Sequence, residues 1–290
     1  MGKISKALEK SGQPQENQTG HTDAAISSIN RGRDRGAFTP PGTSLKKYSG
    51  LDGMFENEKW DLRLKMSSDP HLPYFESFRR LRTSVLHPSS GKKTRTVLVT
   101  SVAPHEGKGF VSANLGIAIA QDIEHHALIL DCDFRSPSLA HLFGQPNEAG
   151  LVDHLKDSVD LSFLIRKTGQ PKLSLIPAGK PPANPSEMLT SSRMSALIEE
   201  VAERYDDRVV LFDTPPNIVA SETGILAKQT DGVVLVVRHG VSKREHVKKF
   251  IDFIGPEKII GLVYNAYPED TIDKLIDKKM GYSYDYGRYY

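Results

Sequence analysis

One segment decides the fold: Thr96-Val-Leu-Val-Thr-Ser-Val-Ala-Pro-His-Glu-Gly-Lys-Gly-Phe110. Its first part, Thr96–Ser101, is a short and largely apolar run, which is typical of a strand buried on both faces. The run Val111–Gln121 that follows has a helical pattern. A glycine-containing loop therefore joins a buried strand to a helix, and Gly107-Lys108 stands just before the helix.

This strand–loop–helix context is that of a phosphate-binding P-loop, in which backbone N–H groups and a lysine hold phosphates. The general pattern G-x-x-x-x-G-K-[ST] is met only in part. Val102 takes the place of the first glycine, and Gly109 replaces the hydroxyl residue that normally ligates Mg²⁺. An ordinary glycine-containing turn is the alternative. The candidate nucleotide-binding residues of the loop are His105, Glu106, Gly107, Lys108, Gly109 and Phe110.

Working outward, further apolar runs have the length of strands. They are Ala127–Asp131, Leu173–Pro177, Val209–Asp213, Gly232–Arg238 and Ile259–Tyr264. Helical stretches of roughly 10–15 residues separate most of them, and Tyr74–Leu86 also reads as a helix. The pattern predicts an α/β fold with a mostly parallel central sheet flanked by helices on both faces.

The organisation along the chain follows from the same patterns. Residues 71–268 are predicted to form one domain. Residues 1–70 are predicted to hold a short N-terminal helix, from the spacing of Ile4, Ala7 and Leu8, followed by a flexible linker. The linker, residues 11–70, is rich in Gly, Ser, Asn, Gln and Pro and shows no sustained period. Residues 269–290 are predicted to be a C-terminal helix and a tyrosine-rich tail. Five of the ten tyrosines lie in this tail: Tyr282, Tyr284, Tyr286, Tyr289 and Tyr290.

Composition excludes several classes of protein. With 38 Lys and Arg against 36 Asp and Glu, the net charge of +2 gives no reason to expect binding to nucleic acid or to an anionic membrane. No apolar stretch approaches the ~18 residues of a membrane span, and the start lacks the apolar core of a signal peptide. The single cysteine, Cys132, excludes an internal disulfide framework. These features predict a soluble, intracellular protein with no direct membrane span.

Carboxylates mark the ends of two other predicted strands. Asp131 and Asp133 are two apart, so in an extended chain they face the same site. Asp213 ends an apolar run, as the Mg²⁺-supporting Asp of a Walker B motif does. Such carboxylates hold Mg²⁺ directly or through water, and one accepts a hydroxyl proton. The alternative for the first pair is a helix N-cap with an ion pair to Arg135.

Together these segments resemble the bacterial tyrosine kinase (BY-kinase) family, P-loop proteins related to the MinD/ParA ATPases that act with polysaccharide export machinery. Ser101–Lys108 resembles the Walker A loop of that family, Leu130–Pro137 its Walker A′ motif D-x-D-x-R-x-P, and Leu211–Pro216 its Walker B motif D-T-P-P. Gly261–Asn265 resembles a late strand whose asparagine, here Asn265, lies near the adenine. The resemblance covers about residues 70–290.

The resemblance implies an ATP-dependent protein tyrosine autokinase that uses ATP and Mg²⁺. Lys108 and the loop amides would hold the β- and γ-phosphates, and Asp131, Asp133 and Asp213 would organise Mg²⁺. Asp131, in preference to Asp133, would orient or deprotonate the incoming phenol. The tyrosine tail would receive the phosphates, delivered in trans to a neighbouring subunit.

Partners and location are implied in the same way. Glu76-x-x-Arg79-x-x-Arg82 matches the helix motif that joins subunits in a homo-oligomeric ring, although a solvated helix face is the alternative. The expected partner is a membrane-embedded polysaccharide co-polymerase, or chain-length determinant protein. The chain would then be cytoplasmic and peripheral at the inner membrane through that partner.

Departures from the family pattern leave alternatives open. The family has Ser or Thr at 109, commonly Thr at 110 and Gly at 105. We therefore expect weaker positioning of Mg²⁺, a bulky Phe110 ring beside the phosphates, and a gain in activity or Mg²⁺ affinity from Gly109→Ser. One alternative is a degenerate nucleotide-binding regulatory subunit, a pseudokinase. A MinD/ParA-type positioning ATPase is disfavoured, because Ala103 and Pro104 stand where that group has an extra lysine.

Overall fold

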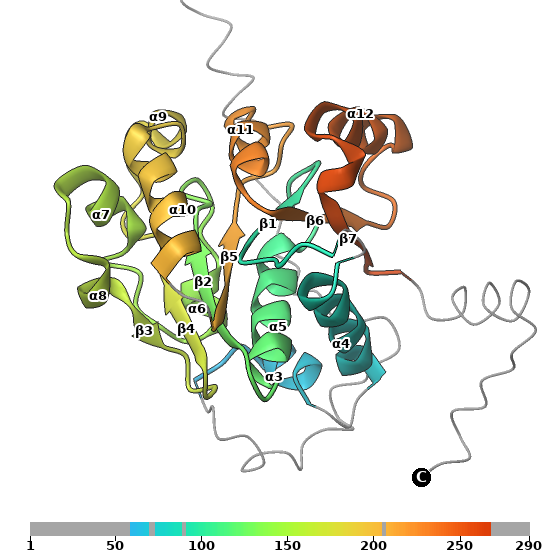
Figure 1. Ribbon diagram of the computed structural model, residues 1–290, viewed down its shortest axis with the longest axis horizontal. Helices are drawn as coiled ribbons and strands as arrows, with labels where there is room; N and C mark the ends of the chain where they lie inside the picture. The colour runs from blue at the N-terminus through green and yellow to red at the C-terminus, as the bar shows by residue number, and fades with distance from the viewer. Residues whose placement is uncertain (1–58, 70–72, 89–90, 205–206, 268–290) are drawn as a thin grey trace, which may run out of the picture. The chain divides into compact units, whose positions relative to one another are not determined.

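The computed structural model describes residues 59–69, 73–88, 91–204 and 207–267 (Figure 1). These residues form a seven-stranded sheet in the order β3-β4-β2-β5-β1-β6-β7. Every neighbouring pair is parallel except β3 and β4, which are antiparallel. The strands are β1 Thr96–Ser101, β2 His126–Asp131, β3 Arg166–Lys167, β4 Leu173–Ile176, β5 Arg208–Asp213, β6 Gly232–Arg238 and β7 Ile259–Asn265.

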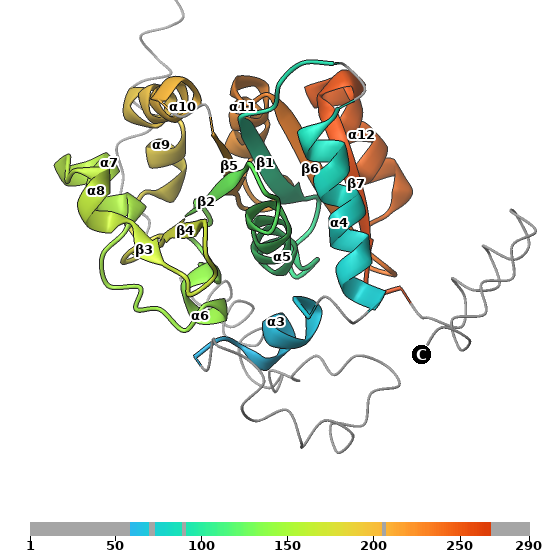
Figure 2. The same ribbon diagram turned by 60° about the horizontal axis from the view of Figure 1, so that its bottom comes forward.

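Helices cover both faces of this sheet (Figure 2). Alternate strand residues point to opposite faces, so Val97 and Val99 belong to one apolar core while Leu98 belongs to the other. The first core is covered by α3 Leu62–Ser67, α4 Pro73–Leu86, α5 Lys108–Ala120 and α6 Leu139–Leu142. The second is covered by α7 Leu151–Asp157, α8 Leu161–Leu164, α9 Pro185–Leu189, α10 Ser192–Arg204, α11 Glu222–Gln229 and α12 Arg244–Ile254. The predicted architecture is confirmed.

The predicted strands and the helix after the loop agree closely with the structure, and two differences concern the start of that helix and one short strand. The helix after the loop begins at Lys108 rather than Val111, because Gly107 with φ 93° ends the loop in a left-handed conformation directly before it. The two-residue strand β3 was not predicted. Its sequence, Arg166-Lys167, carries no apolar pattern, and it is a strand only through its pairing with β4.

The prediction of a flexible linker is wrong for its last part. The segment with α3 packs on the domain: Leu64 is fully buried and Trp60 is 6% exposed. The indole Nε1 of Trp60 donates to the carbonyl of Thr168 at 2.7 Å, and its ring meets Phe143 edge to face at 5.3 Å. A helix of six residues is too short to form alone in water. Tertiary packing therefore stabilises α3, and no periodic pattern in the sequence predicts this helix.

Other predicted segments lie outside the described residues. They are the N-terminal helix, the linker up to residue 58, the C-terminal helix and the tyrosine tail. Within the described part of the chain, no helix combines the length and the apolar character needed to cross a membrane.

Candidate active site

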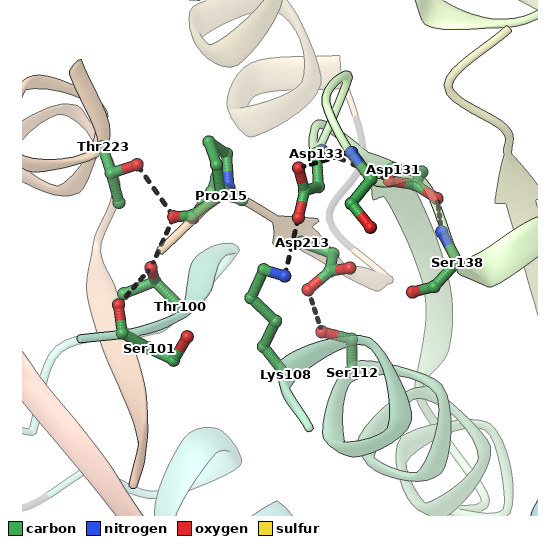
Figure 3. Close-up of polar contacts among 12 residues, drawn as sticks. Thr100, Ser101, Lys108, Ser112, Asp131, Asp133, Ser138, Asp213, Pro215 and Thr223 are labelled. Atoms are coloured by element: carbon green, nitrogen blue, oxygen red, sulfur yellow. Dashed lines mark hydrogen bonds and ion pairs between the residues drawn. The ribbon is translucent and has the colours of Figure 1, made fainter. Parts of the chain in front are cut away.

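The topology of the sheet brings the candidate residues together at one edge. In a parallel sheet, ligands bind beyond the carboxyl ends of the strands. Strand β5 lies between β1 and β2, and Asp131 is the register partner of Asp213. The loop after β1 leads into α5 at Lys108. Lys108, Asp131, Asp133 and Asp213 therefore converge, as the sequence predicted (Figure 3).

The ammonium group of Lys108 lies among these carboxylates. Its Nζ is 2.6 Å from Asp133 Oδ2, and the two side chains are 13% and 2% exposed. Burial lowers the pKa of Lys108, but the nearby carboxylates of Asp213 and Asp133 outweigh burial, so its pKa is raised. The lysine is therefore charged, and it lies at the position of the lysine that contacts the outer phosphates in a P-loop.

Asp131 organises the loop that follows β2. Its Oδ2 accepts hydrogen bonds from the backbone N–H groups of Ser138 and Leu139, both at 3.1 Å, and its Oδ1 accepts from Asp133 N at 3.2 Å. Burial raises the pKa of Asp131 to about 7. The N-cap alternative is thus correct in part, because this carboxylate binds the first amides of α6. The proposed ion pair to Arg135 is wrong.

Arg135 contacts residues outside the carboxylate cluster. Its Nη2 donates to Ser186 Oγ at 2.6 Å and lies 3.4 Å from Glu222 Oε1. Ser186 is in α9 and Glu222 is in α11. Arg135 therefore links the loop after β2 to α9 and α11, which cover the second apolar core. Local sequence patterns did not reveal this role.

Asp213 has one buried carboxylate oxygen without a partner among the described residues. It is fully buried, its Oδ1 accepts from Ser112 Oγ at 3.1 Å, and its Oδ2 has no hydrogen-bond partner in the described part of the chain. Burial raises the pKa of Asp213 well above its usual range, and Lys108 opposes this shift. An unpaired buried carboxylate oxygen costs free energy unless a ligand satisfies it.

The carboxylates suit a Mg²⁺ ion that is held by one or two of them together with water and phosphate oxygens. In the residues that the structure describes, no group of three or more His, Cys, Asp or Glu side chains is spaced to hold a metal directly. Mg²⁺ commonly binds through one or two carboxylates, with water and substrate phosphates completing its octahedron. Asp213, with its free oxygen, fits the role of one such carboxylate.

Hydrogen bonds made by Glu106 and Asn265 hold the loop between β1 and α5 in place. Glu106 is 1% exposed, and its carboxylate accepts from the N–H groups of Ala103 at 2.8 Å and Arg238 at 3.2 Å. Its side chain therefore braces the loop, and a part for Glu106 in binding nucleotide stays a prediction. Asn265 Nδ2 donates to the carbonyl of Glu106 at 2.8 Å, which places Asn265 beside the loop. A Cβ at Gly107 would collide with this amide.

Three residues depart from the family's loop pattern, and the structure shows the surroundings of each. His105 is exposed and has φ 62°, a left-handed conformation that glycine adopts more easily. Phe110 packs edge to face on Phe78 of α4, with ring centroids 6.3 Å apart. A place for this ring beside the phosphates stays a prediction. Gly109 is buried at the start of α5, against Ser138 and Asp213.

The predicted interface motif lies on α4, away from this site. Glu76 and Arg79 form an ion pair at 3.1 Å, with side chains about half exposed. Arg82 instead donates from Nη1 to the carbonyl of Ala118 in α5 at 3.1 Å. Arg82 therefore anchors α4 to the fold, whereas Glu76 and Arg79 face solvent. A role for these residues in a ring stays a prediction.

Comparisons with known proteins agree with the geometry. No family model matches the chain. The chain is 30% identical over 211 residues to tyrosine-protein kinase YwqD of Bacillus subtilis, covering 72% of this chain and 85% of YwqD. It is 31% identical over 199 residues to tyrosine-protein kinase CpsD of Streptococcus agalactiae, covering 68% and 85% of the two chains.

A solved structure supports the same assignment. The kinase domain of Escherichia coli tyrosine kinase ETK superimposes with a TM-score of 0.63 at 31% identity, covering 69% of this chain and 78% of that domain. The fold, the convergence of the three Walker motifs and these two relatives lead to one conclusion. The protein belongs to the family of bacterial tyrosine-protein kinases.

Proposed function

We propose that this chain is an ATP-dependent protein tyrosine autokinase that phosphorylates its own C-terminal tyrosine cluster. The observation that carries the proposal is the charged ammonium of Lys108, held 2.6 Å from Asp133 at the start of α5 and beside Asp213. The loop amides and the N-terminus of α5 bind the phosphates of ATP. Lys108 then exchanges Asp133 for the β- and γ-phosphates.

The chemical step needs positioning more than covalent participation by the protein. The phenol oxygen of a tyrosine forms a bond to the γ-phosphorus, and the bond from that phosphorus to the leaving oxygen of ADP breaks. A free phenol has a pKa of about 10, so its proton goes to a carboxylate, Asp131 or Asp133. Asp213, with one of these carboxylates directly or through water, would hold Mg²⁺, which would supply positive charge against the phosphates.

The proposed acceptors are Tyr282, Tyr284, Tyr286, Tyr289 and Tyr290, presented to a neighbouring subunit. Each phosphate adds about −1.5 to −2 charge, so five would place roughly −8 to −10 on nine residues. Repulsion of that size releases the tail and loosens a ring. The solvent-facing pair Glu76 and Arg79 supports α4 as the contact between subunits in that ring.

The proposed partner is a membrane-embedded polysaccharide co-polymerase, and the proposed process is exopolysaccharide or capsule polymerisation and export. Through this partner the kinase would lie in the cytoplasm at the inner membrane. Membership of the bacterial tyrosine-protein kinase family supports this proposal.

Phosphotyrosine mapping tests the proposal. The purified chain is incubated with Mg²⁺ and ATP, with and without the cytoplasmic segment of a candidate partner, and phosphotyrosine is located by mass spectrometry. We expect phosphate on residues 282–290 that disappears in Lys108→Ala. ATP binding without phosphate in any condition would contradict the kinase and establish the second candidate, a nucleotide-binding pseudokinase subunit. The missing hydroxyl at Gly109 is the observation that favours that candidate.

A further inference from the structure

The space beside Gly109 is already filled. A P-loop normally carries Ser or Thr here, and its hydroxyl ligates Mg²⁺. Gly109 is buried, and a Cβ built on it would collide with Ser138 Oγ and lie 3.2 Å from Asp213 Oδ2. A hydroxyl oxygen is therefore present where the side chain of residue 109 would stand, although it comes from a different part of the chain.

The hydroxyl of Ser138 is not used to cap helix α6. A serine that precedes a helix usually accepts a hydrogen bond from the first helical amides through its side chain. Ser138 makes no such side-chain bond at the start of α6. Asp131 accepts from the amides of Ser138 and Leu139 and so fixes the backbone at this point. Figure 3 shows the Ser138 hydroxyl on the side of the site where Asp213 and Ser112 lie.

A second observation points to a cation at this place. Asp213 Oδ2 is buried and has no hydrogen-bond partner within the described ranges, and it lies next to the same point beside Gly109. The other hydroxyl nearby, on Ser112, is already engaged with Asp213 Oδ1 at 3.1 Å. Ser138 Oγ is therefore the hydroxyl available beside the unpaired carboxylate oxygen. Oxygen ligands of these two kinds are what Mg²⁺ prefers.

We propose that Ser138 Oγ replaces the missing P-loop hydroxyl as a ligand of Mg²⁺ when nucleotide is bound. This proposal rests on the proposed function, because the cation is that of the Mg²⁺–nucleotide complex. It also reverses the expectation for Gly109→Ser. A side chain at 109 displaces Ser138, so the single substitution does not raise Mg²⁺ affinity. Gly109 and Ser138 act as a reciprocal pair.

Exchange of the two residues tests the pair. The full chain is compared with Ser138→Ala, Gly109→Ser and the double variant. Ser138→Thr keeps a hydroxyl, and Ser136→Ala is the matched control, because it removes an exposed hydroxyl from the same loop. Binding of ADP is measured by calorimetry with and without Mg²⁺. Binding of Mn²⁺ to the ADP complex is measured by electron paramagnetic resonance, so that neither readout depends on kinase activity.

We expect Ser138→Ala to weaken the Mg²⁺-dependent part of ADP affinity on the order of tenfold, as loss of a metal-site group does. Affinity without Mg²⁺ should stay within about twofold, the margin of such measurements. The double variant should recover most of the loss, because the hydroxyl introduced by Gly109→Ser then occupies the space that the Ser138 hydroxyl leaves. Ser138→Thr and Ser136→Ala should bind like the original chain.

Three results would overturn the proposal in distinguishable ways. If the original chain binds ADP with Mg²⁺ dependence and Ser138→Ala retains that dependence, the role of Ser138 is wrong while the proposed function stands. If Gly109→Ser alone strengthens Mg²⁺-dependent binding, Ser138 is not the substitute ligand. If the original chain binds no nucleotide, the proposed function and the role of Ser138 fall together.

Discussion

The buried carboxylate of Glu106 offers a quantitative test of how the phosphate loop is held. Its oxygens accept from the N–H groups of Ala103 at 2.8 Å and Arg238 at 3.2 Å. Glu106→Ala removes both bonds. Each buried donor left unsatisfied costs about 1–3 kcal/mol. Because Ala103 and Arg238 are only half-buried, water offsets part of the loss, and the free energy of unfolding should fall by about 2–3 kcal/mol.

Urea denaturation measures this loss directly. The chain has a single tryptophan, Trp60, which is buried in the fold, so its fluorescence reports unfolding alongside circular dichroism. Glu106→Gln should lose about half as much, because the amide keeps one acceptor oxygen but turns an NH₂ group toward the other donor. Glu199→Ala, an exposed change on α10, should stay within about 0.5 kcal/mol.

The same variants link the brace to function. If Glu106 positions the loop, Glu106→Ala should weaken ATP binding more than Glu106→Gln, as measured by calorimetry on folded protein. A loss of stability below about 0.5 kcal/mol in Glu106→Ala, the range of ordinary surface changes, would refute the reasoning. It would mean that other contacts hold the loop and that the two amides find water without cost.

Further predictions concern the surroundings of the site. Leu64→Ala should cost about 2–5 kcal/mol and shift tryptophan emission to the red, whereas Leu62→Ala, exposed in the same helix, should not. A hydrogen bond from the neighbouring arginine lowers the pKa of Asp61 below its unfolded value of 3.8. The charged carboxylate therefore stabilises the fold above pH 3.8, and this contribution is lost as the pH falls below that value. Asp61→Asn should remove this part of the pH dependence of thermal unfolding. Arg82→Ala should lower the free energy of unfolding by about 1 kcal/mol, because it frees a helix carbonyl. Glu76→Ala should leave stability unchanged but weaken self-association in analytical ultracentrifugation.

Most of the sheet was predictable because its strands are buried on both faces. Such strands appear as continuous apolar runs, and six of the seven strands were predicted from such runs, although β7 is only partly buried. The positions of Asp131 and Asp213 at strand ends were also predictable, because parallel strands end at one edge of the sheet. What the sequence did not show is which atom each carboxylate contacts.

The missed features share a physical cause. Segment α3 and strand β3 are too short to carry a period, so only their contacts with the domain create them. The contact of Phe110 with Phe78 depends on how α4 and α5 pack, which local sequence does not show. Ser138 and Gly109 are far apart in the chain, and no local pattern relates them.

The sequence by itself determined the fold class, the P-loop position and the set of charged residues, because these follow from local patterns of apolar runs, glycines and strand ends. Tertiary structure alone decided the partners: Lys108 with Asp133, Glu106 with the loop amides, and Ser138 with the space at Gly109. The physical reason is that hydrogen bonds and ion pairs act over a few ångströms, and only folding brings residues from separate strands within that distance.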